Sequence, residues 1–321
     1  MTQGNPFAFE RCRRSALRCL FIVLSPNVAS ATCVASSDAL PPLLPVATNV
    51  WRVPAAGTEP DPTNGGATIQ LVLVRDGMRL WLVGSGPTPA FGAALACAIE
   101  RMTGRQVTDV VNTRAAPELA LGNFAFPRAR LWALPDVIVA MRARCAQCQD
   151  QLRSRIGAAG ESLHPDRIRA PTLAVGRATQ ATGRLGPFVW HALPRRRGER
   201  TLVLRHRGIV IAQGLLWPGD VPDLRDTHAA TMTTTLHRLR GLSSGAMLLG
   251  ERGAPAAAAQ LDSHLAYLEG LRNSLASQLG STEGASVSAD LPAFAGLPGY
   301  PTTHPLNVQR MWRELELELF R

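Results

Sequence analysis

The chain contains seven histidines, the residue type that most often binds catalytic metals and transfers protons at neutral pH. They are His164, His191, His206, His228, His237, His264 and His304. No two are four residues apart, the spacing that places two imidazoles on one face of a helix to bind zinc. We therefore interpret them as surface or hydrogen-bonded core residues. His191 merits attention because it lies on an expected strand just before Arg196, a position considered below.

Serine and cysteine could supply a nucleophile. Ser85 lies between two glycines and Ser243-Ser244 precede a third, but neither stretch has the glycine-x-serine-x-glycine pattern of a nucleophile elbow. Cys145 and Cys148 have the spacing of redox and metal sites. They fall in an expected helix, without the strand-to-helix context of a thioredoxin motif and without a second cysteine pair for zinc. A disulfide, a reactive dithiol or soft-metal site, and free thiols all stay open for this pair.

The first 31 residues have the layout of a secretory signal. Four arginines between positions 11 and 18 precede an apolar run from Cys19 to Leu24, and Ala29-Ser30-Ala31 offers small residues for cleavage. Arg13-Arg14 also weakly resembles a twin-arginine export motif. We therefore expect a periplasmic or secreted protein. No other run reaches the roughly 18 apolar residues of a membrane span, so we expect none in the mature form.

Export would allow the remaining cysteines to form disulfides. Removal of residues 1–31 would leave Cys33, Cys97, Cys145 and Cys148. In an oxidising compartment an even number of cysteines favours disulfides, and four cysteines allow three pairings. The sequence does not choose among the three.

The net charge of +10 comes from arginine alone, because the chain contains no lysine. These arginines are scattered, aromatic residues make up only 5% of the chain, and no nucleic-acid-binding motif is present. We therefore expect a basic surface exposed to solvent and no nucleic-acid partner.

The elements that must position these residues alternate between strands and helices. A proline-, serine- and alanine-rich linker is expected over residues 32–48, one large domain over 49–280, and a loop with a helix packed on that domain over 281–321. Expected strands are Val50–Val53, Ala67–Val74, Met78–Val83, Val107–Asn112, Leu131–Ala133, Thr201–Arg205 and Ile209–Gln213. Expected helices are Ala90–Met102, Val137–Arg155, Ala229–Leu239, Ala256–Leu279 and Leu306–Phe320. Such an order predicts an α/β protein with helices outside mixed sheets.

The order of several short motifs resembles the metallo-β-lactamase superfamily, and within it the exported quinoprotein relay system zinc metallohydrolase group. The motifs include Val50-Trp51, the glycines before the first hairpin, Gly86-Pro87-Thr88, and Asn112-Thr113 followed by Gly122-Asn123. The C-terminal stretch 307–316 is similar to the end of that group. The resemblance covers roughly residues 48–320. It implies a four-layer αββα metallo-β-lactamase-like sandwich, and it favours a structural disulfide between Cys145 and Cys148.

The zinc ligands that this resemblance implies are missing. The family's Thr-His-x-His-x-Asp-His loop corresponds here to a stretch with Arg114, Ala116, Glu118 and Leu119 at the ligand positions. The other ligand positions are occupied by Gly84, Arg196, Gly214 and Arg252. Arginine stays protonated in proteins, and glycine, alanine and leucine side chains have no donor atom, so seven of these eight residues cannot bind zinc and only Glu118 keeps a carboxylate. The resemblance therefore predicts no zinc and no other cofactor.

Three interpretations of function follow. The first is a non-catalytic accessory or binding protein linked to a periplasmic quinoprotein dehydrogenase system, with a quinoprotein or cytochrome partner. The second is a metallo-β-lactamase-type hydrolase with residual activity. The third is a redox or metal-handling protein built on Cys145 and Cys148. The fold alone cannot decide between them, because function depends on the site.

The residues at the lost ligand positions suggest a ligand of their own. Arg114, Arg196 and Arg252 are expected to converge on one cleft, with Glu118 placed to pair with one of them. The remaining positive charge would suit a small molecule that carries carboxylates or phosphates. Drift from histidine to arginine codons is the alternative explanation for these arginines.

Overall fold

The computed structural model describes residues 42–196, 198–279 and 287–319, which lie in the unit Ala35–Arg321. Its first sheet has seven strands that lie side by side in chain order. They are β1 (Leu44–Ala47), β2 (Val50–Val53), β3 (Leu71–Asp76), β4 (Arg79–Val83), β5 (Asp109–Val111), β6 (Arg130–Ala133) and β7 (Leu173–Ala174). Strands β1 to β4 pair in antiparallel fashion as a meander, and β4 to β7 pair in parallel. The sheet is therefore half antiparallel and half parallel.

The second sheet has five strands in the order β12-β11-β10-β9-β8. They are β8 (Thr182–Leu185), β9 (Phe188–Arg196), β10 (Glu199–His206), β11 (Ile209–Ile211) and β12 (Met247–Leu249). All neighbours are antiparallel except β11 and β12, which are parallel because α4 lies between them in the chain.

Alternating apolar residues divide each sheet between two cores. In β3, Val72 and Val74 face the second sheet, whereas Leu71 and Leu73 pack toward α1. In β10, Leu202 and Leu204 lie in the core between the sheets. Side chains in a strand point to opposite faces in turn, so sheets covered on both faces need apolar residues at successive positions. This is why the strand sequences are continuously apolar.

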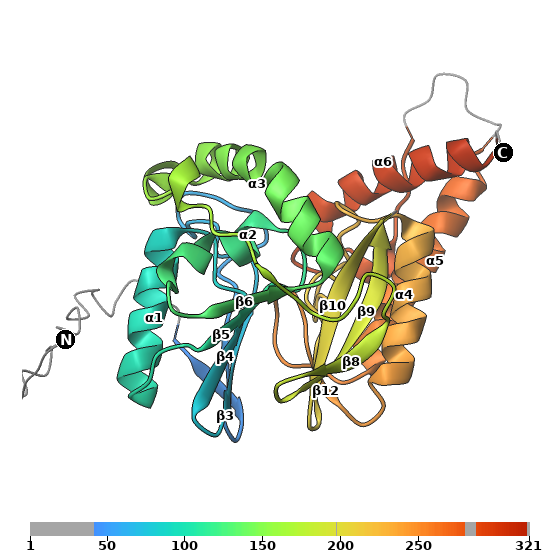
Figure 1. The fold of residues 1–321 in the computed structure, drawn as a ribbon. Coiled ribbons are helices and arrows are strands. Elements are labelled where there is room, and N and C mark those ends of the chain that lie inside the picture. The colour runs from blue at the N-terminus through green and yellow to red at the C-terminus, as the bar shows by residue number, and fades with distance from the viewer. Residues whose placement is uncertain (1–41, 197, 280–286, 320–321) are drawn as a thin grey trace, which may run out of the picture. The chain divides into compact units, whose positions relative to one another are not determined.

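Helices complete the layers (Figure 1). Helix α1 (Pro89–Thr103) covers the outer face of the first sheet. Helices α4 (Ala229–Leu242), α5 (Ala259–Ala276) and α6 (Tyr300–Leu319) share a core with the outer face of the second sheet. Helix α3 (Pro135–Ile156) contacts both β10 and the short helix α2 (Pro117–Ala120). The four-layer αββα sandwich predicted from the sequence is confirmed.

Two expected boundaries are wrong. The linker expected over residues 32–48 contains β1, which pairs with β2 and extends the first sheet. Helix α6 begins at Tyr300 and includes Pro305, although a proline inside a helix removes a hydrogen bond. Contacts with the rest of the protein outweigh this loss. The ring of His304 stacks on Tyr300, and its Nδ1 lies 2.8 Å from the hydroxyl of Tyr267.

The expected signal over residues 1–31 lies outside the described residues, as does Cys33, so export stays a prediction. Among the described residues, no helix is long and apolar enough to cross a membrane.

Candidate functional site

A cleft opens at the end of the sandwich where the parallel strands β4, β5 and β6 end. Its walls come from the segment after β5, helix α3, the β9–β10 turn, and the segments after β11 and β12. The charged residues that line it are Arg114, Glu118, Arg144, Arg155, Arg195, Arg196, Glu199, Arg200, Asp223, Arg225, Asp226, Glu251 and Arg252. Its volume of about 220 Å³ lies below the roughly 300–1,000 Å³ of sites for drug-sized ligands, so it suits a smaller molecule.

The structure brings most of the residues singled out at the ligand positions together. Arg114, Ala116, Glu118, Arg196 and Arg252 all line the cleft. The other three positions form its support. Gly84 packs against Leu119, and Gly214 packs against Arg114 and Arg195.

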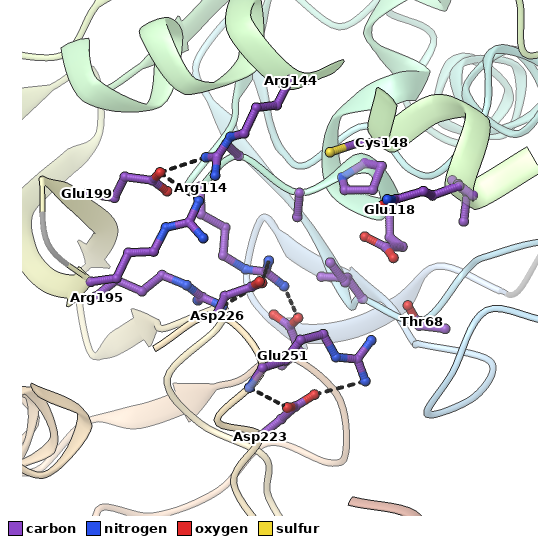
Figure 2. A pocket seen from close by; sticks show the side chains of 18 of the residues that line it. Thr68, Arg114, Glu118, Arg144, Cys148, Arg195, Glu199, Asp223, Asp226 and Glu251 are labelled. Carbon is purple, nitrogen blue, oxygen red and sulfur yellow. Dashed lines mark hydrogen bonds and ion pairs between the residues drawn. The ribbon is translucent and has the colours of Figure 1, made fainter. Parts of the chain in front are cut away.

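Arg114 is the centre of the cleft floor and is buried, with 7% of its surface exposed. One of its terminal nitrogens donates a hydrogen bond to Glu251, and the other lies 3.9 Å from Asp226. The second carboxylate oxygen of Glu251 accepts a hydrogen bond from the backbone N–H of Gly214 at 2.7 Å. The expected pairing with Glu118 is therefore wrong, because Glu251 takes that role (Figure 2).

Arg195 is a second buried arginine that the sequence interpretation missed. Its Nη1 donates to the carbonyl oxygen of Gly214 at 3.1 Å, and its Nη2 lies 3.3 Å from Asp226. Burial and the neighbouring charge of Arg114 lower the pKa of Arg195 to about 10. Burial opposes ionisation of Asp226, but Arg195 and Arg114 outweigh it and lower the pKa of that carboxyl. The alternation of buried residues that begins at Phe188 does not predict this burial. The register of β9 and β10 shifts here, with Pro194 opposite Arg200 and Arg196 opposite Glu199.

Arg252 connects the cleft to the C-terminal helix. Its Nε and Nη2 both lie 3.0 Å from one carboxylate oxygen of Asp220. The other oxygen of Asp220 accepts the N–H groups of Val221 and Gly299, just before α6. Only 9% of Arg252 is exposed, so its main role is to hold this junction.

The side chains at the rim of the cleft are more exposed than those of its floor, and the rim has more arginines than carboxylates. Arg144 on α3 and Arg196 at the end of β9 both bind one carboxylate, that of Glu199, at 2.7 Å and 2.6 Å. Their side chains are 37% and 31% exposed, so part of each guanidinium faces solvent. Two cations that share one anion leave a local excess of positive charge.

Glu118 lies on the opposite side of the cleft, near Cys148 and Thr68 (Figure 2). It is half-buried and forms no ion pair with any residue in the described part of the chain. Burial raises the pKa of its carboxyl, although a hydrogen bond with its own backbone and the charge of Arg114 oppose that effect.

The expected disulfide between Cys145 and Cys148 is not formed. Both thiols are free, with Cys145 buried and Cys148 half-buried. They lie in the middle of α3, where residues three apart point about 60° away from each other around the helix axis. Burial raises the pKa of Cys145 to about 11 and also raises that of Cys148, so neither thiol has the lowered pKa of a reactive cysteine. Because Cys33 is outside the described residues, the pairing of Cys97 stays a prediction.

Comparison with solved structures identifies the architecture. The mono-zinc form of a metallo-β-lactamase from Pseudomonas aeruginosa matches with a TM-score of 0.56 and 14% identity, over 71% of this chain and 94% of that one. Metallo-β-lactamases from Pontibacter korlensis and Erythrobacter litoralis match with TM-scores of 0.55 and 0.54, at 13% and 16% identity. Each match again covers 71% of this chain, with 98% and 95% of the other. This chain has the metallo-β-lactamase fold. No protein-family model and no curated protein matches the sequence.

A metallo-β-lactamase fold implies a zinc site, but the residues at this end of the sandwich do not fit one. Zinc takes imidazole, thiolate or carboxylate ligands, and of the eight positions only Glu118 has such a group. None of the seven histidines lines the cleft. Within the described residues, no three histidine, cysteine, aspartate or glutamate side chains are grouped so as to hold a metal.

Neighbouring side chains also leave no room for a ligand side chain at the two glycine positions. A Cβ atom on Gly84 would lie 2.5 Å from Cδ1 of Leu119, at another of the eight positions. A Cβ atom on Gly214 would collide with Nη1 of Arg195 and lie 2.7 Å from Nε of Arg114. Both glycines have a positive φ, +78° and +76°, which disfavours any side chain. Neither glycine position therefore accommodates a side chain that could bind a metal.

Proposed function

We propose that this protein is a metal-free, non-hydrolytic member of the metallo-β-lactamase fold that binds a small anion in its cleft. The observation that carries this proposal is the rim pair, Arg144 and Arg196, which share the single carboxylate of Glu199. Guanidinium groups bind carboxylates and phosphates through paired hydrogen bonds, and these two still have exposed donors.

The charges of the whole cleft support the same proposal. Eight arginines and five carboxylates line it, and carboxylates behind its wall neutralise three of the arginines. Those three pairs are Arg252 with Asp220, Arg200 with Asp136, and Arg225 with Glu59. The charges then balance in number but not in position. Positive groups are crowded at the rim, where Arg144 and Arg196 share Glu199, and at Arg195, whose pKa is lowered by burial and by the charge of Arg114. A bound anion would relieve that repulsion.

Two parts of the proposal rest on the sequence alone. The signal expected over residues 1–31 would place this cleft in the periplasm or outside the cell. The resemblance to the quinoprotein relay group suggests a quinoprotein dehydrogenase or cytochrome as its partner. The raised pKa values of the Cys145 and Cys148 thiols give no support to a redox function.

Citrate is a suitable probe because it is a small trianion. We expect the wild-type protein to bind citrate at low ionic strength, as measured by isothermal titration calorimetry. The Arg144→Ala/Arg196→Ala variant should bind at least about 100-fold more weakly, because hydrogen bonds to charged groups contribute roughly 1.5–3 kcal/mol each.

The matched control is Arg142→Ala/Arg153→Ala, which removes the same two charges from exposed positions of α3 outside the cleft. This control should change citrate affinity by less than about threefold, since exposed charges at a distance are screened by salt. An equal loss in both double variants, or no citrate binding by the wild type, would contradict the proposal.

A further inference from the structure

The two sides of the cleft present different groups. On one side lie Arg144 and Arg195, together with Glu199 and Asp226 (Figure 2). Arg196 shares Glu199 with Arg144. On the other side lies Glu118, and in Figure 2 no dashed line reaches it. A ligand that fills the cleft would therefore meet hydrogen-bond donors at one end and an acceptor at the other.

Glu118 is held in this position by its neighbours in the chain. It occupies the first turn of α2, directly after Pro117, whose ring fixes the backbone at the start of that helix. The next residue, Leu119, is fully buried against Gly84 and anchors α2 to the first sheet. The backbone of Glu118 is therefore held in place by the residues on both sides of it.

The arginines of the cleft do not neutralise Glu118. The guanidinium of Arg114 is held by Glu251 and Asp226, and that of Arg225 is held by Glu59 and Asp223. Arg114 and Arg225 lower the pKa of the Glu118 carboxyl only through longer-range attraction, because neither guanidinium lies within ion-pair distance of it. A half-buried carboxylate that is hydrogen-bonded to its own backbone still has acceptor positions left, so a hydrogen-bond donor on a ligand would find an acceptor here.

We propose that the cleft selects small anions that also carry a hydrogen-bond donor, a hydroxyl or an ammonium group, with the anionic end on Arg144 and Arg196 and the donor on Glu118. This inference rests on the proposed function, and it adds the class of ligand: hydroxy acids and amino acids rather than plain polycarboxylates. Sites built to hydrogen-bond a ligand hydroxyl discriminate strongly against the analogue that lacks it.

Two matched pairs of probes test this selectivity. Citrate and propane-1,2,3-tricarboxylate differ by one hydroxyl group, and aspartate and succinate differ by one ammonium group. We expect the wild-type protein to bind citrate at least tenfold more tightly than propane-1,2,3-tricarboxylate, or aspartate at least tenfold more tightly than succinate. The pair that shows the preference identifies the donor.

Glu118→Ala should abolish the preference by weakening the donor-bearing probe while leaving its partner within about threefold. Glu118→Gln keeps an acceptor oxygen but no charge, so it should retain part of a hydroxyl preference and lose an ammonium preference. Thermal unfolding of both variants verifies that they are folded, which is expected because Glu118 is only half-buried.

Each remaining outcome is decisive. Equal affinities within both pairs in the wild type would overturn this inference and leave anion binding intact. A preference that survives in Glu118→Ala would assign the donor to another residue and would also overturn it. Failure of every probe to bind, citrate included, would overturn the proposed function itself.

Discussion

Replacing Glu251 with alanine is expected to lower the free energy of unfolding by about 3–5 kcal/mol. Glu251 is 6% exposed and binds both the guanidinium of Arg114 and the backbone N–H of Gly214. Its removal would leave a buried cation and a buried N–H without their main partner. Breaking one side of a buried ion pair costs far more than the intact pair contributes, because the remaining charge is not solvated.

Urea denaturation followed by circular dichroism measures this change. The control is Glu199→Ala, which removes a carboxylate with two arginine partners at the exposed rim and should cost no more than about 1 kcal/mol. If Glu251→Ala costs as little as Glu199→Ala, the network around Arg114 does not hold the cleft floor together.

Introducing a side chain at Gly84 is expected to destabilise the fold by about 2–5 kcal/mol in Gly84→Ala, and by more in Gly84→Asp. The positive φ of +78° alone strains any L-residue by roughly 1–2 kcal/mol, and the overlap with Leu119 and Leu71 adds an overpacking cost of about 1–3 kcal/mol. Aspartate would also bury a charge that has no metal to bind.

The Gly77→Ala variant separates the cost of backbone strain from the cost of steric overlap. Gly77 also has a positive φ, +57°, but no atom lies within 4 Å of its hypothetical Cβ, so this variant should show the strain alone. Leu119→Ala, itself expected to cost about 2–5 kcal/mol, should lessen the penalty of Gly84→Ala by about 1 kcal/mol in the double variant. Strict additivity would show that Leu119 does not occupy the space that a side chain at Gly84 would need.

The fold could be predicted because its determinants are local. Successive apolar residues in β3 and β4, the Arg75-Asp76-Gly77 turn and the spacing of leucines in α5 are all properties of short windows. The start of α6 could not, since Pro305 argues against a helix there and the contacts of His304 come from α5 and residue 289. Strand β1 was missed because Pro45 interrupts its apolar residues.

For the candidate site, too, properties of single residues could be predicted, whereas pairings between distant residues could not. Whether a side chain can bind zinc is a property of that residue alone, so the sequence is enough to see that seven of the eight positions have no zinc-binding group. Which acid pairs with Arg114 could not, because Glu251 is 137 positions away along the chain and reaches it only through the segment after β12. For the same reason, that partners distant in the chain cannot be read from the sequence, Asp220 was not predicted as the partner of Arg252. The sequence interpretation also left Arg144 out of the expected anion cleft and included Arg114 and Arg252, which the structure buries in ion pairs with Glu251 and Asp220.

The zinc content of the purified protein tests the central claim most directly. The protein would be exposed to excess zinc, desalted and measured by elemental analysis, in parallel with a Cys145→Ala/Cys148→Ala variant that excludes adventitious thiolate sites. We predict well under one tightly bound zinc ion per chain in both proteins, together with background hydrolysis of β-lactams and thioesters. One or two zinc ions per chain, retained in the cysteine variant, would contradict the account of a metal-free cleft.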